Sequence, residues 1–221
     1  MTTAQTQTHH GHTPSHLLTA LLTTITDSII PLTTTGVARG CKVFGASILH
    51  KTTLEPIISS TNDEITSPLL HGEVSTLLAF HRHNNTLPTH NRIDPKNCIF
   101  LSTHEPCSLC LSAITWSGFD NFYYLFTYRD TMDVFDIPHD IKILQEVFQT
   151  AEKGQGEGGR LYNRENKFWK CWSCQELVDE SEEGERARLE ERLREVKRWY
   201  GGLSETYQQS KASQTGQIPL N

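Results

Sequence analysis

One histidine, two cysteines and one carboxylate lie in two short motifs and have the residue types of a catalytic metal site. His71 and Glu73 come first, separated by one glycine, and Cys107 and Cys110 follow a proline at position 106. Zinc prefers nitrogen and sulfur ligands in tetrahedral geometry, and a catalytic zinc keeps three protein ligands and one position for water. His71, Cys107 and Cys110 are three ligands of this kind. A fourth protein ligand would displace the water, so we expect Glu73 to serve as general acid and base.

The sequence around each motif predicts a helix that begins at the motif. Apolar residues follow Glu73 at positions 74, 77, 78 and 80, which is typical of a helix with His71 and Glu73 in its first turn. Pro106 suits the first position of a second helix, because its missing N–H costs nothing there. Cys107 and Cys110 then share one face near the positive end of that helix, which favours the thiolate form that binds zinc. A structural zinc site is the alternative, although such sites usually have four protein ligands.

Together the two motifs form the H-x-E and P-C-x-x-C pattern of zinc-dependent nucleobase deaminases. On these residues the chain resembles the cytidine and deoxycytidylate deaminase superfamily, with residues 70–77 similar to cytosine deaminase and residues 105–116 similar to guanine deaminase and tRNA adenosine deaminase. The resemblance covers roughly residues 14–150 and implies an α/β fold, a three-layer α/β/α sandwich with a mixed central sheet. It also implies that the histidine and the two cysteines bind Zn²⁺ and that Glu73 carries the proton.

The same resemblance directs attention to residues that contact the substrate. A family asparagine contacts the substrate ring or sugar, and Asn62 is the nearest match, although it lies two residues closer to the histidine than usual. A turn at residues 62 and 63 is an equal alternative, because asparagine and aspartate both favour turns. In cytosine and guanine deaminases an acidic residue after the fourth strand reads the base. Asp136 is our candidate, ahead of Asp130 and Asp133, with a solvated carboxylate as the alternative for each.

Aromatic side chains are candidates for stacking on a flat substrate, because bases are commonly held between aromatic or apolar faces. In this chain the candidates are Phe126, Tyr128 and Trp116. Core packing is the favoured explanation for Trp116.

These residues indicate a zinc-dependent hydrolytic deaminase that releases ammonia from a free base or nucleoside, with cytosine and guanine as the first candidates. One alternative is an RNA- or DNA-editing deaminase of the tRNA adenosine type. Another is a non-catalytic, deaminase-like binding subunit, which the presence of Glu73 disfavours.

The order of predicted elements agrees with the implied fold. They are a helix at 14–30, strands at 43–49 and 56–59, a helix at 70–84, a strand at 98–101, a helix ending near 116, a strand at 122–126 and a helix at 138–150. Because parallel strands joined by helices cross over in the right-handed sense, this order predicts an antiparallel pair at one side and parallel strands for the rest. The fifth strand that is usual in the family is not evident before Pro138.

A second Cys-x-x-Cys segment, Cys171 to Cys174, follows a glycine-rich linker or insertion at 152–160. A second zinc would need two further ligands, and a redox pair would need a thioredoxin-like context; the sequence offers neither. Residues 161–178 instead predict a helix with aromatic residues on one side, so we expect both cysteines to pack in a core or an interface. Residues 182–208 predict a charged helix with a narrow apolar stripe, which packs on the deaminase domain or on a partner subunit.

The expected organisation is a zinc deaminase domain at 13–151, the linker at 152–160 and a C-terminal helical extension at 161–208, between disordered tails at 1–12 and 209–221. The net charge of −6 disfavours tight binding to nucleic acid, with a local basic groove as the alternative. We therefore expect a small-molecule base or nucleoside as the partner, and a homodimer. No apolar run reaches the ~18 residues of a membrane span, and no secretory signal is evident, so the expected location is the cytoplasm, with the nucleus as the alternative.

Overall fold

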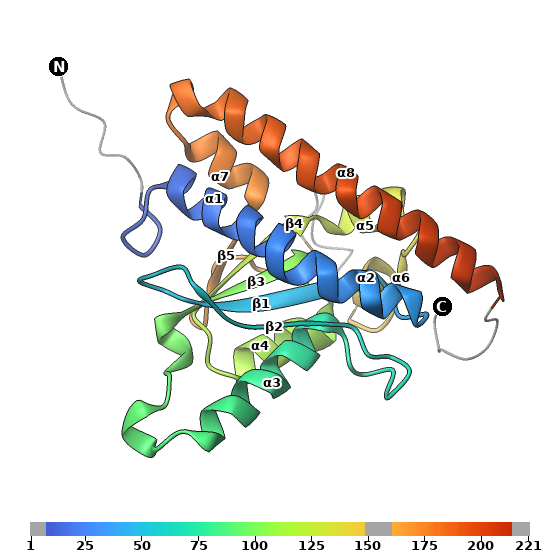
Figure 1. Cartoon of the computed structure of the whole chain (residues 1–221), viewed down its shortest axis with the longest axis horizontal. Coiled ribbons are helices and arrows are strands. Elements are labelled where there is room, and N and C mark those ends of the chain that lie inside the picture. Colours follow the sequence, from blue (N-terminus) through green and yellow to red (C-terminus); the bar gives the residue numbers. More distant parts are fainter. Residues whose placement is uncertain (1–7, 149–160, 214–221) are drawn as a thin grey trace.

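The computed structural model describes residues 8–148 and 161–213, with a five-stranded sheet at the centre (Figure 1). The strands lie in the order β2-β1-β3-β4-β5. Their bounds are β1 Gly45–His50, β2 Pro56–Thr61, β3 Cys98–His104, β4 Asn121–Phe126 and β5 Lys170–Ser173. β1 pairs antiparallel with β2 and β3, whereas β3, β4 and β5 run parallel. Helices cover both faces, so the predicted α/β/α sandwich with a mixed sheet is confirmed.

Two helices on one face begin at the two sequence motifs. α3 (Gly72–Thr86) and α4 (Ser108–Trp116) lie side by side below the sheet in Figure 1. They bury an apolar cluster that includes Leu77 and Phe80 from α3, Ile114 from α4 and Phe100 from β3. Two short 3-10 turns, Thr89–Asn91 and Pro95–Asn97, lead from α3 into β3.

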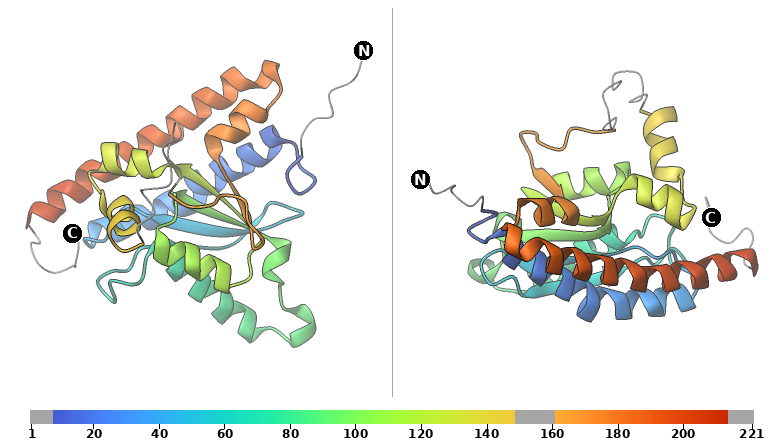
Figure 2. Two further views of the ribbon diagram at one scale, coloured as in Figure 1. Left: turned by 180° about the vertical axis from the view of Figure 1, so that it is seen from behind. Right: turned by 90° about the horizontal axis from the view of Figure 1, so that it is seen from above.

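The opposite face carries the N-terminal helix and the two C-terminal helices. α1 (Pro14–Thr24), the π-helical turn η1 (Ile25–Ile29) and α2 (Ile30–Ala38) form one continuous helix. Pro31 lacks the N–H that would continue the regular bonding, and the π turn ends two residues before it, at Ile29. α7 (Cys174–Glu180) and α8 (Glu183–Ser213) complete this layer, and α8 runs along α1 and α2 (Figure 2).

The helix Pro14–Ala38 is the one segment within the described residues that is long and apolar enough to cross a membrane by length and composition. Its apolar side is used inside the fold, because Leu17, Leu21, Ile25 and Ile29 have no exposed surface and belong to the cluster against the sheet. It therefore packs as a core helix.

α8 confirms the charged helix that the sequence predicts and shows where its apolar stripe packs. Leu189, Leu193, Val196 and Tyr200 are buried in the same cluster as α1. The stripe therefore packs within this chain, against α1 and the sheet. The helix also extends past residue 208, into the stretch that we expected to be a tail.

The prediction of a helix over residues 161–178 is wrong, because this segment forms β5 and then α7. Its apolar residues alternate between the two faces of the sheet: Cys171 packs on the α3 side, whereas Trp172 stacks on Tyr123 on the other side, with ring centroids 5.1 Å apart. An alternation of period two is typical of a strand. β5 is the fifth strand that the sequence did not reveal, and it lies beyond the glycine-rich segment at 152–160, which is outside the described residues.

Two short helices follow β4. α5 (Tyr128–Phe135) was not expected, and it begins with a capping box in which Thr127 and Asp130 each accept a backbone N–H of the other. α6 (His139–Glu146) lies within the predicted helix at 138–150 but ends at Glu146, and residues 147–148 form a turn.

Residues 8–12, which we assigned to the N-terminal tail, contact the core. His9 is 3% exposed, its Nδ1 lies 3.1 Å from the hydroxyl of Tyr123, and its Nε2 pairs with Glu180 in α7. The start of the described chain is therefore fixed to the sheet and to the C-terminal helices.

Candidate active site

Both motif helices begin at residues that we expect to bind metal. His71 is the N-cap residue of α3, and Cys107 is the N-cap residue of α4. Gly72 follows His71 where α3 starts against β1, and a Cβ at Gly72 would lie 2.8 Å from the backbone of Gly45. Only glycine fits such an approach without a shift, so Gly72 allows His71 to lie close to the sheet.

The structure brings the three predicted ligands together. The Nδ1 atom of His71 lies 3.4 Å from the sulfur of Cys107 and 3.6 Å from that of Cys110, and the two sulfurs are 3.6 Å apart. In a tetrahedral zinc site with ordinary bond lengths, ligand atoms are about 3.3–3.8 Å apart. The three atoms therefore fit a zinc ion in spacing and in chemistry. Within residues 8–148 and 161–213, no other group of three or more His, Cys, Asp and Glu side chains is close enough to hold a metal.

Glu73 lies beside this group without belonging to it. The residue is 4% exposed, its Oε1 accepts a hydrogen bond from the hydroxyl of Ser102 at 3.0 Å, and its Oε2 lies 3.3 Å from the sulfur of Cys110. Burial and the nearby Cys107 sulfur raise the pKa of Glu73. A carboxyl group held in this way can exchange a proton with a group bound at the open side of the metal site.

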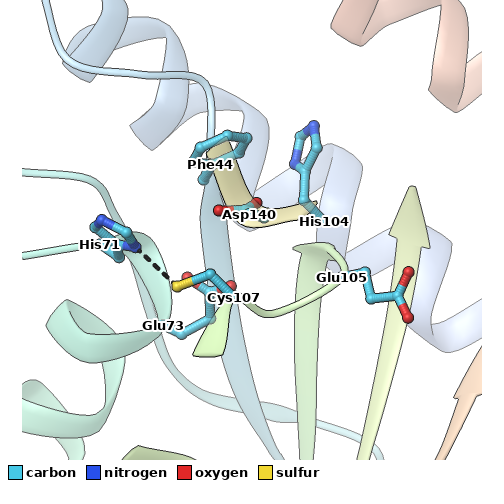
Figure 3. A pocket seen from close by; sticks show the side chains of 7 residues that line it. All are labelled: Phe44, His71, Glu73, His104, Glu105, Cys107 and Asp140. Atoms are coloured by element: carbon cyan, nitrogen blue, oxygen red, sulfur yellow. Dashed lines mark hydrogen bonds between the residues drawn. The ribbon is translucent and has the colours of Figure 1, made fainter. Parts of the chain in front are cut away.

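The cavity beside these residues is small. Its volume is about 10 Å³, which is room for about one water molecule. It is lined by Phe44, His71, Glu73, His104, Glu105, Cys107 and Asp140 (Figure 3).

Asp140 is the acidic residue that lines this cavity, and the sequence did not single it out. It lies in the first turn of α6 and is half-buried, and burial, with the nearby Cys107 and Glu73, raises its pKa to about 8. Our candidate Asp136 is instead exposed, in a left-handed conformation (φ 54°) at the end of α5, and does not line the cavity. The sequence did contain one signal that could have pointed to Asp140: an acidic residue in the first turn of a helix that begins at a proline, Pro138.

Asn62 follows β2 directly and contacts the first residue of α3. Its side-chain oxygen accepts a hydrogen bond from the backbone N–H of Gly72, next to His71. The residue is buried, and its side-chain nitrogen has no hydrogen-bond partner among the residues that the structure describes. Asn62 is not among the residues that line the small cavity.

The aromatic candidates do not form the cavity wall. Trp116 is 90% exposed at the end of α4, so the expectation that it packs in the core is wrong. Phe126 is buried and stacks on His104 at 4.8 Å, as part of the core beneath the site. Tyr128 is also buried, and its hydroxyl donates to the carbonyl of Pro106. The aromatic ring at the cavity belongs to Phe44, which no motif marked.

Comparison with known families identifies the region that carries the motifs. Residues 32–126 match the family model described as the cytidine and deoxycytidylate deaminase zinc-binding region. The matched span contains His71, Glu73, Cys107 and Cys110. Residues 32–126 therefore carry the zinc-binding region of the cytidine and deoxycytidylate deaminase family. This region is the zinc-binding part of the family, and the side chains of His71, Cys107 and Cys110 within it are close enough to hold Zn²⁺.

The chain is also similar to chains of solved structures. A mutant protein in complex with 8-azaguanine is 13% identical with a TM-score of 0.50, covering 96% of this chain and 100% of that chain. Guanine deaminase from Nitrosomonas europaea is 16% identical with a TM-score of 0.45, covering 88% of this chain and 98% of that chain. Guanine deaminase from Bacillus subtilis is 22% identical with a TM-score of 0.44, covering 65% of this chain and 84% of that chain. No curated protein sequence matches the chain.

Proposed function

We propose that the protein is a zinc-dependent hydrolytic deaminase that removes an exocyclic amine from a nucleobase or nucleoside and releases ammonia. The observation that carries this proposal is the position of Glu73, a buried carboxyl group next to a three-ligand metal group that it does not join. A structural zinc site has no use for such a group, because its fourth position is filled by a protein ligand. Bound zinc would supply an activated water molecule by lowering the pKa of the water towards ~7.

Glu73 performs the proton transfers in this proposal. The hydrogen bond from Ser102 holds its Oε1, so its Oε2 is the oxygen that faces the metal group. Glu73 takes a proton from the attacking water, passes it to a ring nitrogen and then helps to protonate the leaving ammonia. Each transfer needs a carboxyl group within hydrogen-bond reach and fixed in orientation.

Asp140 and Asn62 are the residues that we assign to recognition of the ring. The Asp140 carboxyl group lines the same small cavity as His71 and Cys107 and can form hydrogen bonds with N–H groups at one edge of a base. The unpartnered side-chain nitrogen of Asn62 can donate to a ring oxygen, a ring nitrogen or a sugar hydroxyl. Cytosine and guanine, which present both donors and acceptors along one edge, are the first candidates.

A second cavity bears on the size of the substrate. Its volume is about 680 Å³, within the range of small-molecule sites, and Glu105 lines both this cavity and the small one. Arg129 and Lys142 also line the second cavity and give it basic character. Substrates that carry a sugar or a phosphate therefore belong in the test beside the free bases.

The test is ammonia release by zinc-loaded protein from cytosine, guanine, adenine, their nucleosides and their nucleotides, with Glu73→Gln as the blank. We expect release from one substrate class and none in the blank. Silence across the panel, with zinc verified at about one per chain, would contradict a small-molecule deaminase. Turnover in the blank would contradict the role of Glu73.

A further inference from the structure

Glu105, the residue before Pro106, is a buried carboxylate that faces away from the metal group. Figure 3 shows its carboxylate turned from Glu73 and Cys107 towards the neighbouring strands. Its backbone N–H donates to the carbonyl of Phe126 at 2.7 Å, and its Oε2 accepts the backbone N–H of Tyr128 at 2.8 Å. Glu105 therefore joins the loop that enters α4 to the turn between β4 and α5.

The second oxygen of this carboxylate is bound by a residue from a distant segment. The hydroxyl of Tyr162 donates to Oε1 of Glu105 at 2.7 Å. Tyr162 lies beyond the glycine-rich segment, in the stretch that leads into β5, and its ring packs edge-on against Tyr128 and Trp169. A buried carboxylate is costly unless its oxygens are bound. Tyr162 supplies one of the hydrogen bonds to Glu105, beside those from the backbone N–H of Tyr128 and the side chain of Tyr124.

These contacts surround the residue that precedes a predicted metal ligand. The Tyr128 hydroxyl donates to the carbonyl of Pro106, and Glu105 is bound on the other side of the same proline. Cys107 follows directly as the N-cap of α4, so a shift of this loop would move its sulfur relative to His71.

We infer that Tyr162 is a positioning residue for the metal centre: through Glu105 it fixes the loop at Pro106, and thereby the Cys107 sulfur. The inference rests on the metal group of the proposed function and not on the identity of the substrate. Loss of a residue that orients a metal ligand without itself binding the metal typically lowers metal affinity by about 10–100-fold. The segment after the insertion therefore contributes to the site as well as to the sheet.

The experiment is zinc release from the full-length, zinc-loaded protein to a colorimetric chelator. Tyr162→Phe keeps the ring and removes the hydroxyl, and we expect release about 10-fold faster than from the wild type. Tyr123→Phe is the matched control, because it removes a buried tyrosine hydroxyl that contacts His9, away from the metal loop. We expect release from this control at the wild-type rate.

A double-mutant cycle separates positioning from general loss of stability. Glu105→Gln keeps the shape of the side chain and one oxygen, so we expect release between that of the wild type and that of Tyr162→Phe. If Tyr162 acts through Glu105, adding Tyr162→Phe to Glu105→Gln has a smaller effect than Tyr162→Phe alone. The inference would be overturned if the effects of Tyr162→Phe and Glu105→Gln on the rate of zinc release were additive. It would also be overturned if Tyr123→Phe accelerated zinc release as much as Tyr162→Phe does, or if Tyr162→Phe released zinc within about twofold of the wild-type rate.

The rate of zinc release does not depend on turnover, so this test remains valid even if the protein lacks the proposed activity. Hydrogen exchange of the metal-free protein gives a second readout that needs no zinc. The backbone N–H groups of Glu105 and Tyr128 should exchange faster in Tyr162→Phe and at the wild-type rate in Tyr123→Phe. Unchanged exchange at both positions would also overturn the inference.

Discussion

Two Cys-x-x-Cys segments of this chain have the same spacing and opposite structural outcomes. In the first, the sulfurs of Cys107 and Cys110 lie 3.6 Å apart and face His71. In the second, Cys171 packs in the apolar cluster on the α3 side of the sheet, whereas Cys174 packs in the cluster on the α8 side. The spacing alone therefore does not make a metal site.

The difference arises from where the helix begins within each segment. Pro106 follows the end of β3, and Cys107 is the N-cap of α4, so both cysteines lie at the first turn of one helix. In the second segment β5 continues to Ser173, which is the N-cap of α7 and forms a capping box with Glu176. Cys171 is then a strand residue and Cys174 a helix residue, and their side chains diverge.

The largest expected effect is on metal content. Cys107→Ala should reduce bound zinc from about one per chain to nearly none, because a three-ligand site that loses a thiolate keeps only two protein ligands. Cys171→Ala removes an equally buried thiol from the second segment and should retain the zinc. Metal analysis of both purified variants checks this, and full zinc occupancy in Cys107→Ala would show that the ligand assignment is wrong.

The next effect is on turnover. Glu73→Gln should keep zinc and lower kcat by about 10²–10⁴-fold, because the amide cannot accept the proton of the attacking water. Glu180→Gln is a control with a carboxylate outside the site, where it contacts His9. Steady-state kinetics gives kcat for both variants, and parallel metal analysis shows whether each retains its zinc. A wild-type kcat in Glu73→Gln would contradict the assignment of Glu73 as the proton-transferring residue.

A smaller effect distinguishes the two acidic candidates for recognition. Asp140→Asn should lower kcat/KM by about 10–100-fold, which corresponds to the loss of about 1–3 kcal/mol when a buried hydrogen-bond partner is left unmatched. Asp136→Asn should leave kcat/KM unchanged, because Asp136 is exposed and lies away from the cavity. The same loss in both variants would show that the cavity wall is assigned incorrectly.

The smallest effect is on stability and concerns the second cysteine segment. Cys174 has no exposed surface, and Cys174→Ser should lower the free energy of unfolding by about 1–3 kcal/mol by burying a hydroxyl group in an apolar cluster. Zinc content and turnover of this variant should match the wild type. Urea denaturation measures the change, and loss of zinc from the folded variant would mean that the second segment takes part in the metal site.

The metal ligands could be predicted from the sequence because each lies at the start of a helix that its own neighbours predict. Pro106 and the apolar residues after Glu73 are local signals, and they place the ligands without any knowledge of the sheet. The antiparallel pair and the parallel strands followed from the order of elements for the same reason.

The features that the sequence did not reveal depend on contacts between distant segments. Asp140 reaches the cavity because α5 and α6 fold back over the site, and no local pattern contains that path. β5 follows an insertion, and its residues pack on both faces of the sheet, so its aromatic residues resembled one side of a helix. His9 is buried by Tyr123 and Glu180, which a polar, histidine-rich stretch does not indicate.

The most direct test of the contrast between the two segments is zinc X-ray absorption spectroscopy of the zinc-loaded wild-type protein. The structure predicts two sulfur ligands, from Cys107 and Cys110, with lighter atoms completing the coordination, including the imidazole nitrogen of His71. Three or four sulfur ligands would contradict the account, because they would require Cys171, Cys174 or another cysteine to join the metal and would close the position that hydrolysis needs.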